Sequence, residues 1–354
     1  MKAVKIGDRM VGEGYPVYII AEIGSNFDGD LDKAKHLVDL AIECGCDAVK
    51  FQSFCTNKII CREAFDRIQE ESKIVSFQSK WNKSVFEIYN DAQFKREWHK
   101  EIFSYCRGKN ISFFSSAYDE EAIDLLEELG VAAHKVGSGE ISWPDRLKRF
   151  GETGTPVILG TGAATLAEID EAVRAIRSTG NEDIILLQCV TNYPSLFEDA
   201  NIRVIDTLRT AFNVQVGYSD HTPGSVVPLG AVARGACMIE KHFTDDKRKT
   251  GPDHPHAMDV DDMKEMVRDI RNMEKALGSS VKGVVPSERE TVILQRRSLF
   301  AARDIKKGDV LDARAIAVLR PQTGILPKDL DIVLGRTAGC DIKKGESILW
   351  DKIA

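Results

Sequence analysis

The sequence has no long hydrophobic run. Of its 354 residues, 43% are hydrophobic and 29% are charged, yet no apolar stretch approaches the roughly 18–20 residues that a transmembrane helix needs. The first residues, MKAVKIGDRMVGEG, also lack the apolar core of a secretory signal peptide. We therefore expect a globular protein in the cytoplasm, with no membrane partner.

A recognisable cysteine pattern is also absent. The eight cysteines include no CxxC pair, and Cys44 and Cys46 are separated by a single residue. No disulfide framework or zinc spacing is present. Cys189 and Cys237 fall in expected core strands, where cysteine acts as a small hydrophobe. This pattern favours free, reduced thiols, as in a cytoplasmic protein.

There is no excess of positive charge. The formal net charge of −7 argues against nucleic acid or an anionic membrane as the main partner. Net charge does not describe a single pocket, however, and a local group of cations remains compatible with binding a small anion.

What the chain does contain is a repeated pattern of eight short apolar runs, most of them separated by stretches of helical periodicity. A continuous apolar run bounded by turn residues is typical of a strand buried on both faces. Strands that alternate with helices indicate a parallel sheet, and eight such units predict a closed (β/α)8 TIM barrel, an α/β fold. The runs cover residues 17–24, 48–54, 111–118, 132–140, 156–162, 184–190, 214–220 and 237–243.

The intervening segments predict the barrel's helices and one long loop. Residues 55–85 are mixed and polar, and a long loop after a barrel strand is usually a lid or a substrate-binding insert. Helices are expected over residues 31–44, 86–109, 120–129, 166–178 and 260–277.

The pattern changes after the eighth unit. We expect a barrel domain over residues 1–280, a linker over 281–295 and a small, mostly β domain over 296–354. The sequence Asp-Ile-Lys-Lys-Gly occurs twice in this tail, at 304–308 and 341–345. Some 60 residues is small for an independent core, so the tail should depend on the barrel or on a second subunit.

Two histidines end neighbouring strands of the expected barrel. His221 follows the seventh apolar run and His242 lies in the eighth. Two imidazoles at this position would hold one divalent metal such as Mn²⁺ or Fe²⁺. The alternative is a pair of hydrogen-bonded histidines at the barrel mouth.

Amines and hydroxyls also gather at the strand ends, at Lys50, Lys135, Ser138 and Ser219. Buried lysines are costly unless an anion is near, so this set suits a phosphate or carboxylate. A lysine that forms a Schiff base, as in class I aldolases, is an open alternative.

Two acids end other strands. Glu22 and Glu140 are each candidates for a general acid or base, or for a salt bridge to Lys50 or Lys135. The rigid, polar loop 251–257, GPDHPHA, follows the eighth strand and either covers the mouth or forms a surface turn.

Taken together, these residues resemble the sialic acid synthase family, which makes N-acetylneuraminate and related nine-carbon acids. The tail resembles the family's antifreeze-like (SAF) domain. The matching strings are AEIGSN (21–26), AVKFQ (48–52), KVGSGEI (135–141), YP (193–194), GYSDHT (217–222), EKHFT (240–244), GPDH (251–254) and RRSLFAARDIKKGD (296–309).

The resemblance implies a metal-dependent condensation of phosphoenolpyruvate with an N-acylated mannosamine-type or diamino-dideoxy hexose. The products are a nine-carbon 2-keto acid and phosphate. It also implies a domain-swapped homodimer and a divalent metal, Mn²⁺ with Mg²⁺ or Co²⁺ as alternatives. The implied roles are metal binding by His221 and His242; catalysis by Glu22, Glu140 and Lys135; and substrate binding by Lys50, Gln52, Ser138, Thr161, Thr191, Tyr193, Ser219, Asp253 and Arg320.

The sequence departs from the family pattern at a few positions. Phe27 stands in place of a histidine, Gly160 and Ala257 stand where serine is common, and Gln322-Thr323 replaces a glycine-rich step. Phe27 is expected on the sugar side of the site. The departures at Phe27 and Gly160 leave a non-catalytic sugar-binding relative open as an alternative. A Schiff-base pyruvate aldolase is a second alternative, because nothing in the sequence excludes it.

Overall fold

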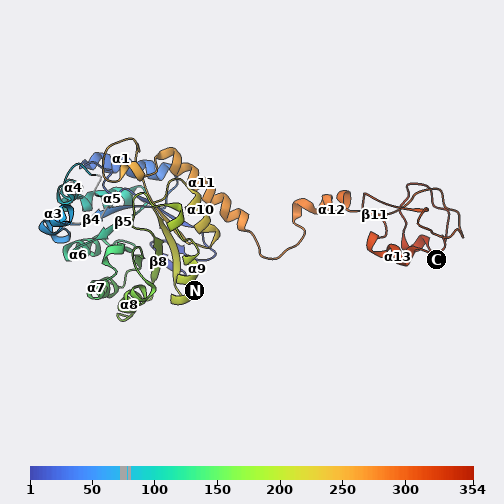
Figure 1. The fold of residues 1–354 in the computed structure, drawn as a ribbon, viewed down its shortest axis with the longest axis horizontal. Coiled ribbons are helices and arrows are strands. Elements are labelled where there is room, and N and C mark those ends of the chain that lie inside the picture. The colour runs from blue at the N-terminus through green and yellow to red at the C-terminus, as the bar shows by residue number, and fades with distance from the viewer. Residues whose placement is uncertain (72–77, 79–80) are drawn as a thin grey trace. The chain divides into compact units, whose positions relative to one another are not determined.

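The computed structural model describes residues 1–71, 78 and 81–354. The chain forms two compact units, Met1–Gly278 and Ser279–Ala354. The first unit contains a closed barrel of eight strands surrounded by helices, and the second contains a two-stranded antiparallel sheet (Figure 1). The predicted fold class is confirmed.

Each of the eight apolar runs contains one barrel strand. All neighbouring pairs are parallel, in the closed order β10-β3-β4-β5-β6-β7-β8-β9. The strands are buried almost throughout, which is why their sequences are continuously apolar and do not alternate. They are β3 (Tyr18–Glu22), β4 (Ala48–Ser53), β5 (Ser112–Ala117), β6 (His134–Val136), β7 (Val157–Gly160), β8 (Ile184–Cys189), β9 (Gln215–Asp220) and β10 (Met238–His242).

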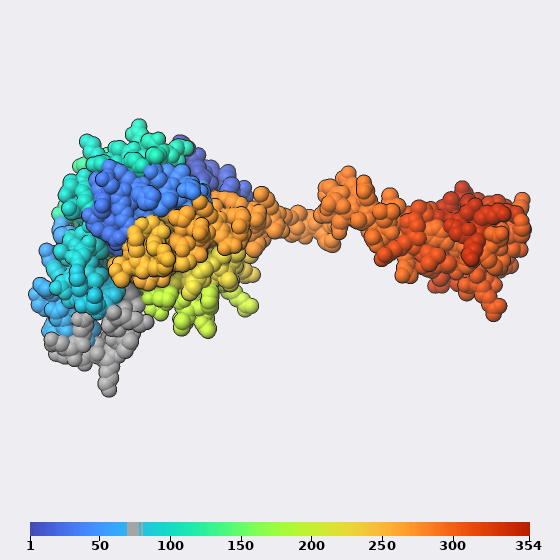
Figure 2. Space-filling model, turned by 90° about the horizontal axis from the view of Figure 1, so that it is seen from above, coloured from blue at the N-terminus to red at the C-terminus, as the bar shows by residue number. Residues whose placement is uncertain are grey.

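Helices cover the outside of the barrel. Figure 2 shows the first and last of the barrel helices, α1 in blue and α11 in orange, side by side on the surface, and the two are in contact. This contact closes the helical ring where the first and last of the barrel's strand–helix units meet. The barrel unit's helices are α1 (Leu31–Glu43), α2 (Thr56–Ile59), α3 (Arg62–Glu71), α4 (Val85–Asp91), α5 (His99–Gly108), α6 (Glu120–Leu129), α7 (Pro144–Glu152), α8 (Leu166–Arg177), α9 (Val204–Phe212), α10 (Val226–Ala233) and α11 (Val260–Leu277).

The prediction of one helix over residues 86–109 is wrong. Residues 86–109 do not form a single helix; α4 ends at Asp91 and α5 begins at His99, after a short 3-10 turn at Arg96–Trp98. The reason is Phe94, which is 1% exposed and packs against Phe27 and Phe51. The chain leaves the helical path to bury this ring.

The loop expected over residues 55–85 contains short helices in its described part, namely α2 and α3. Residues 72–77 and 79–80 of the predicted lid lie outside the described residues.

A hairpin that the sequence did not reveal closes the amino end of the barrel. Strands β1 (Val4–Ile6) and β2 (Arg9–Val11) pair antiparallel. Val4, Ile6 and Val11 are buried in the same apolar cluster as the barrel-lining side chains Ile20 and Phe114. Because this end is filled, the barrel interior is accessible from the carboxyl end.

The second unit is built around its internal repeat. Strands β11 (Ser298–Ala301) and β12 (Ile316–Leu319) pair antiparallel. The two Asp-Ile-Lys-Lys-Gly copies meet through a bridge between Ile305 and Ile342. Asp304 accepts from the backbone N–H of Lys344 at 2.9 Å, and Asp341 accepts from that of Lys307 at 3.0 Å. The repeat therefore forms a reciprocal pair of turns. This unit also contains α12 (Arg289–Gln295) and α13 (Leu330–Val333).

In the part of the chain that the structure describes, we find no helix with both the length and the apolar character that crossing a bilayer requires.

We expect Gly217→Ala to destabilise the barrel. An added Cβ would lie 2.6 Å from both Leu187 Cδ2 and the carbonyl oxygen of Met238, and overpacking of this kind costs about 1–3 kcal/mol. The measurement is urea unfolding of the full chain followed by circular dichroism.

Gly108→Ala is the matched control, because this exposed helical glycine has no neighbour within 4 Å of an added Cβ. Its free energy of unfolding should stay the same or rise, since alanine is the better helix former. Equal behaviour of the two variants would contradict the packing argument.

Candidate active site

Polar side chains converge at the carboxyl end of the barrel because its strands are parallel and all end there. Residues two apart on a strand point to the same side. Lys50 therefore shares a side with Gln52 on β4, and Glu240 shares a side with His242 on β10. Each pair combines an ionic group deeper in the barrel with a polar group nearer the mouth.

The deepest layer is a network of buried ions. Lys50 Nζ lies 2.8 Å from Glu22 Oε2 and 3.9 Å from Glu240 Oε1. Lys135 Nζ lies 3.6 Å from the same Glu240 oxygen, to which Ser219 donates at 2.9 Å. All five side chains are at most 5% exposed. Glu22 forms the salt bridge to Lys50 that was one of its two predicted roles.

Burial and charge shift the pKa values of these groups in different directions. Burial raises the pKa of Glu22 to about 7, although Lys50 opposes the shift. Burial alone would raise the pKa of Glu240, but Lys135 and Lys50 outweigh it and hold that pKa below its usual value. Burial lowers the pKa of Lys135. Near neutral pH, Glu22 is therefore the carboxyl best able to exchange a proton.

Small polar groups follow β6, the strand of Lys135, and β7, its neighbour. Ser138 Oγ accepts from the backbone N–H of Gly162 at 3.0 Å and lies 3.1 Å from Cys189 Sγ. The Thr161 hydroxyl donates to the carbonyl oxygen of Leu187 at 2.9 Å, so it fixes the turn after β7. Gly160 has no room for a side chain, because an added Cβ would lie 2.7 Å from Ser138 Oγ.

The predicted pair of histidines lies together at the mouth. The rings of His221 and His242 are 5.5 Å apart, and the Tyr193 ring packs 4.1 Å from His221. His221 Nδ1 donates to the carbonyl oxygen of Val190 at 2.7 Å, which leaves the Nε2 lone pair free to accept or to bind a metal. Burial lowers the pKa of His221 to about 3 and places that of His242 well below its usual value. Both imidazoles are thus in the neutral, metal-ligating form.

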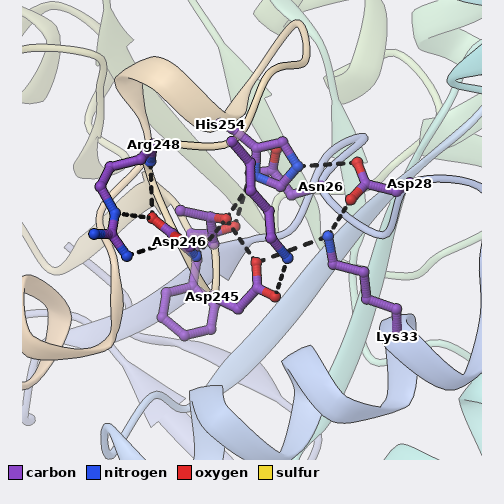
Figure 3. A network of polar contacts seen from close by, with 10 residues as sticks. Asn26, Asp28, Lys33, Asp245, Asp246, Arg248 and His254 are labelled. Carbon is purple, nitrogen blue, oxygen red and sulfur yellow. Dashed lines mark hydrogen bonds and ion pairs between the residues drawn. The ribbon is translucent and has the colours of Figure 1, made fainter.

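The loop 251–257 is anchored over the mouth by a polar network (Figure 3). His254 lies between Asp28 Oδ1, at 2.9 Å from Nε2, and the Thr244 hydroxyl, at 2.6 Å from Nδ1. Asn26 donates to the carbonyl oxygen of Phe243 at 2.9 Å. Further ion pairs join Lys33, Asp245 and Lys249 on the same side. The loop is therefore a rigid part of the site, in agreement with the first of its two predicted roles.

Anchoring the loop brings two more side chains to the mouth. Asp253 Oδ2 accepts from both the backbone N–H and the hydroxyl of Ser25, each at 2.8 Å. The ligand atoms of His242, Asp253 and His256 all lie within 4.8 Å of one another. Buried nitrogens there are unpaired: among the described residues, His242 Nδ1 and His256 Nε2 have no hydrogen-bond partner. This donor set fits a divalent metal.

A cavity of about 160 Å³ opens beside these groups. It combines aromatic faces with polar groups, the usual character of a small-molecule site. The predicted residues Gln52, Tyr193, His242 and Asp253 line it. The other lining residues are Gly24, Ser25, Phe54, Trp81, Ile88, Tyr89, Ala92, Tyr118 and Pro252.

Some predicted residues lie apart from this group. Glu140 faces Arg146, with 3.8 Å between Oε2 and Nε, and has no ion pair with either buried lysine. Thr191 is exposed beyond the end of β8, but its side chain lies near that of Ser138: a Cβ added at Gly162 would lie 2.7 Å from Thr191 Cγ2 and 3.1 Å from Ser138 Oγ. Arg320 is an exposed residue of the second unit.

The expected position of Phe27 on the sugar side is wrong. Its ring is 0% exposed and packs edge-on against Phe94 and Trp98, beneath the helices and away from the cavity lining. An aromatic side chain gains more from this apolar cluster than from a polar mouth.

Sequence reasoning considered Glu240 only as a neighbour of the histidines, and His256 only as part of the loop 251–257, and did not include either among the site residues. Glu240 was available from strand alternation, because it precedes His242 by two residues and must share its side. His256 had no such signal. Its position depends on the fold of the loop, which the sequence does not specify.

The fold and the site define a (β/α)8-barrel protein with a charged cavity at its carboxyl end. Residues 37–282 match the NeuB family model and residues 296–354 match the SAF domain. The chain therefore belongs to the NeuB family, and the predicted resemblance to the sialic acid synthases is confirmed.

Individual relatives agree. The chain is 41% identical to the uncharacterized protein MJ1065 of Methanocaldococcus jannaschii, over 100% of this chain and 99% of that protein. It is 38% identical to the N,N'-diacetyllegionaminic acid synthase of Campylobacter jejuni, over 93% of this chain and 98% of the relative. The solved N-acetylneuraminic acid synthetase of Leptospira borgpetersenii is 30% identical with a TM-score of 0.71, over 82% and 95% of the two chains.

We expect the buried ions to be strongly coupled. Glu240→Gln leaves Lys135 and Lys50 undercompensated, which should lower the free energy of unfolding by about 3–5 kcal/mol. Adding Lys135→Met removes one of the two cations and should recover part of that loss. Urea unfolding of the single and double variants measures the coupling.

Asp145→Asn is the control, because its pairing with Lys148 is exposed and such pairs contribute about 0–1 kcal/mol. Purely additive effects of Glu240→Gln and Lys135→Met would show that the two side chains do not interact.

Proposed function

We propose that this protein is a nonulosonic acid synthase. It condenses phosphoenolpyruvate with an N-acylated mannosamine-type or diamino-dideoxy hexose, giving a nine-carbon 2-keto acid and phosphate. The observation that carries the proposal is the placement of two buried lysines beside a cluster of imidazoles at one barrel mouth. The synthases among the chain's relatives support it.

The lysine layer is suited to phosphoenolpyruvate, which carries a phosphate and a carboxylate. Lys50 and Lys135 supply the cations, and the hydroxyl of Ser138, which accepts from the backbone N–H of Gly162, is the neutral group that we add to them. Such groups hold charge in a site from which water is excluded. We assign Thr161, Thr191 and Ser219 to the same anion side, with Thr161 acting through the turn that it fixes.

The imidazole layer is suited to a divalent metal, for which Mn²⁺ is our first choice. His221 and His242 would hold it, since both are neutral and buried. When bound, the metal acts as a Lewis acid on the sugar's carbonyl oxygen.

The condensation needs a carbon nucleophile, a water molecule and a general acid or base. C3 of the enol attacks the aldehyde carbon, water adds at C2, and phosphate leaves from C2. We assign the deprotonation of this water to Glu22 and not to Glu140. Glu22 has a pKa of about 7 and accepts from Gln52, a cavity residue, at 2.7 Å. Glu140 instead faces Arg146.

The cavity is suited to the sugar. Gln52, Tyr193 and Asp253 offer polar groups, and Phe54 and Tyr89 offer aromatic faces for N-acyl substituents. The family resemblance also implies a domain-swapped homodimer. We propose that this chain forms one, and that its Arg320 completes the site of the partner subunit.

One observation favours a second function. Burial lowers the pKa of Lys135, and a lysine with a lowered pKa is the type that forms a Schiff base with a keto acid. Borohydride trapping with pyruvate would then leave a covalent adduct on Lys135. The proposed synthase gives no such adduct.

The test is phosphate release from phosphoenolpyruvate in the presence of Mn²⁺, with N-acetylmannosamine, its 6-phosphate and diacetamido-trideoxy hexoses as acceptors. We expect release with one acceptor and its loss on addition of a chelator. Sugar binding without release from any acceptor would contradict catalysis and favour the non-catalytic alternative.

Lys135→Ala tests the anion side. We expect kcat/KM to fall about 10²–10³-fold, as when one charge-stabilising group is removed. Lys100→Ala, at an exposed position of α5, is the control and should keep full activity. Full activity in Lys135→Ala would contradict this assignment.

A further inference from the structure

His256 is a buried imidazole at the barrel mouth that the proposed function does not use. Its side chain is 6% exposed. Its ring lies 4.8 Å from that of His242 and 5.2 Å from that of Tyr193. It therefore lies beside His242, a proposed metal ligand, and Tyr193, a proposed sugar contact.

The polar atoms at this point lack protein partners. Within the described residues, His256 Nε2 and His242 Nδ1 accept and donate no hydrogen bond. His256 Nε2 lies 3.8 Å from Asp253 Oδ1, too far for a hydrogen bond. Unpaired buried polar atoms are uncommon and indicate a missing group between them. Two nitrogens and one carboxylate oxygen surround this position.

Side-chain hydrogen bonds fix Asp253 and His254, the two loop residues that lead to His256. His254 is fixed by Asp28 and Thr244 (Figure 3), and Asp253 is fixed by Ser25. A site whose donors are held by neighbouring hydrogen bonds binds without the cost of ordering a loop. A structural role for His256 alone would not require two unpaired nitrogens facing one carboxylate.

We propose that His256 is a third imidazole ligand of the metal centre, and that it and Asp253 join His221 and His242 around one divalent ion. This inference rests on the proposed function, because it concerns the same centre. Within this set, His242, His256 and Asp253 supply two imidazoles and one carboxylate, a combination typical of Fe²⁺ and related ions. The added nitrogen favours Co²⁺ and Fe²⁺ over Mn²⁺, since imidazole prefers the later metals and Mn²⁺ prefers oxygen.

The test measures metal binding directly, without turnover. Full-length, metal-stripped protein is titrated with Co²⁺ and with Mn²⁺ by calorimetry, and the visible absorption of the Co²⁺ form is recorded. We compare the wild type with His256→Gln. The control is His36→Gln, which alters an exposed histidine of α1.

We expect His256→Gln to weaken Co²⁺ binding at least about tenfold, since even groups that only orient ligands cost that much. Mn²⁺ binding should fall less, so that the preference for Co²⁺ shrinks. The Co²⁺ absorption should change in His256→Gln and stay unchanged in His36→Gln.

Three results would overturn the proposal. Unchanged affinity in His256→Gln, with binding lost in both His221→Gln and His242→Gln, would restrict the centre to that pair and leave the proposed function intact. Equal weakening of both metals with a lower midpoint of thermal unfolding would make His256 a residue that supports the loop. No metal binding by the wild type would remove the metal from the proposed function as well, and phosphate release would then decide that function separately.

Discussion

The structure depends on compensating buried charge at one end of the barrel. Two lysines and two glutamates are almost completely removed from water there, and each ion would be costly without its partners. Glu240 lies near both lysines, which come from β4 and β6. It has this position only because β10 returns to pair with β3. The closed topology and the stability of the ionic layer therefore require each other.

The barrel was predictable because burial on both faces leaves a direct mark on sequence, a continuous apolar run. The gathering of polar strand ends followed from topology alone, since parallel strands all end at the same side. This is why His221 and His242, which the sequence placed at the ends of neighbouring strands, lie with their rings 5.5 Å apart. The ion-pair partners of the charged residues were harder to predict. The partner of Glu140 is Arg146, and no periodicity distinguishes that partner from a lysine.

Other features depended on tertiary contacts that leave no local signal. The helix expected over residues 86–109 is interrupted because Phe94 joins a cluster of aromatic rings drawn from distant segments. The same cluster buries Phe27, whose place in a family motif suggested a position in the site. A motif locates the backbone of a residue, whereas the direction of its side chain depends on what packs around it.

The closing strand β10 has a consequence for biosynthesis. It carries Glu240 and His242, and the loop that follows it carries Asp253 and His256. Until β10 has been made, the nascent chain has neither a closed barrel nor Glu240, the carboxylate that pairs with Lys135 and lies near Lys50 beside Glu22. The last barrel strand to be made thus completes the hydrogen-bonded ring and the buried ionic layer in one event.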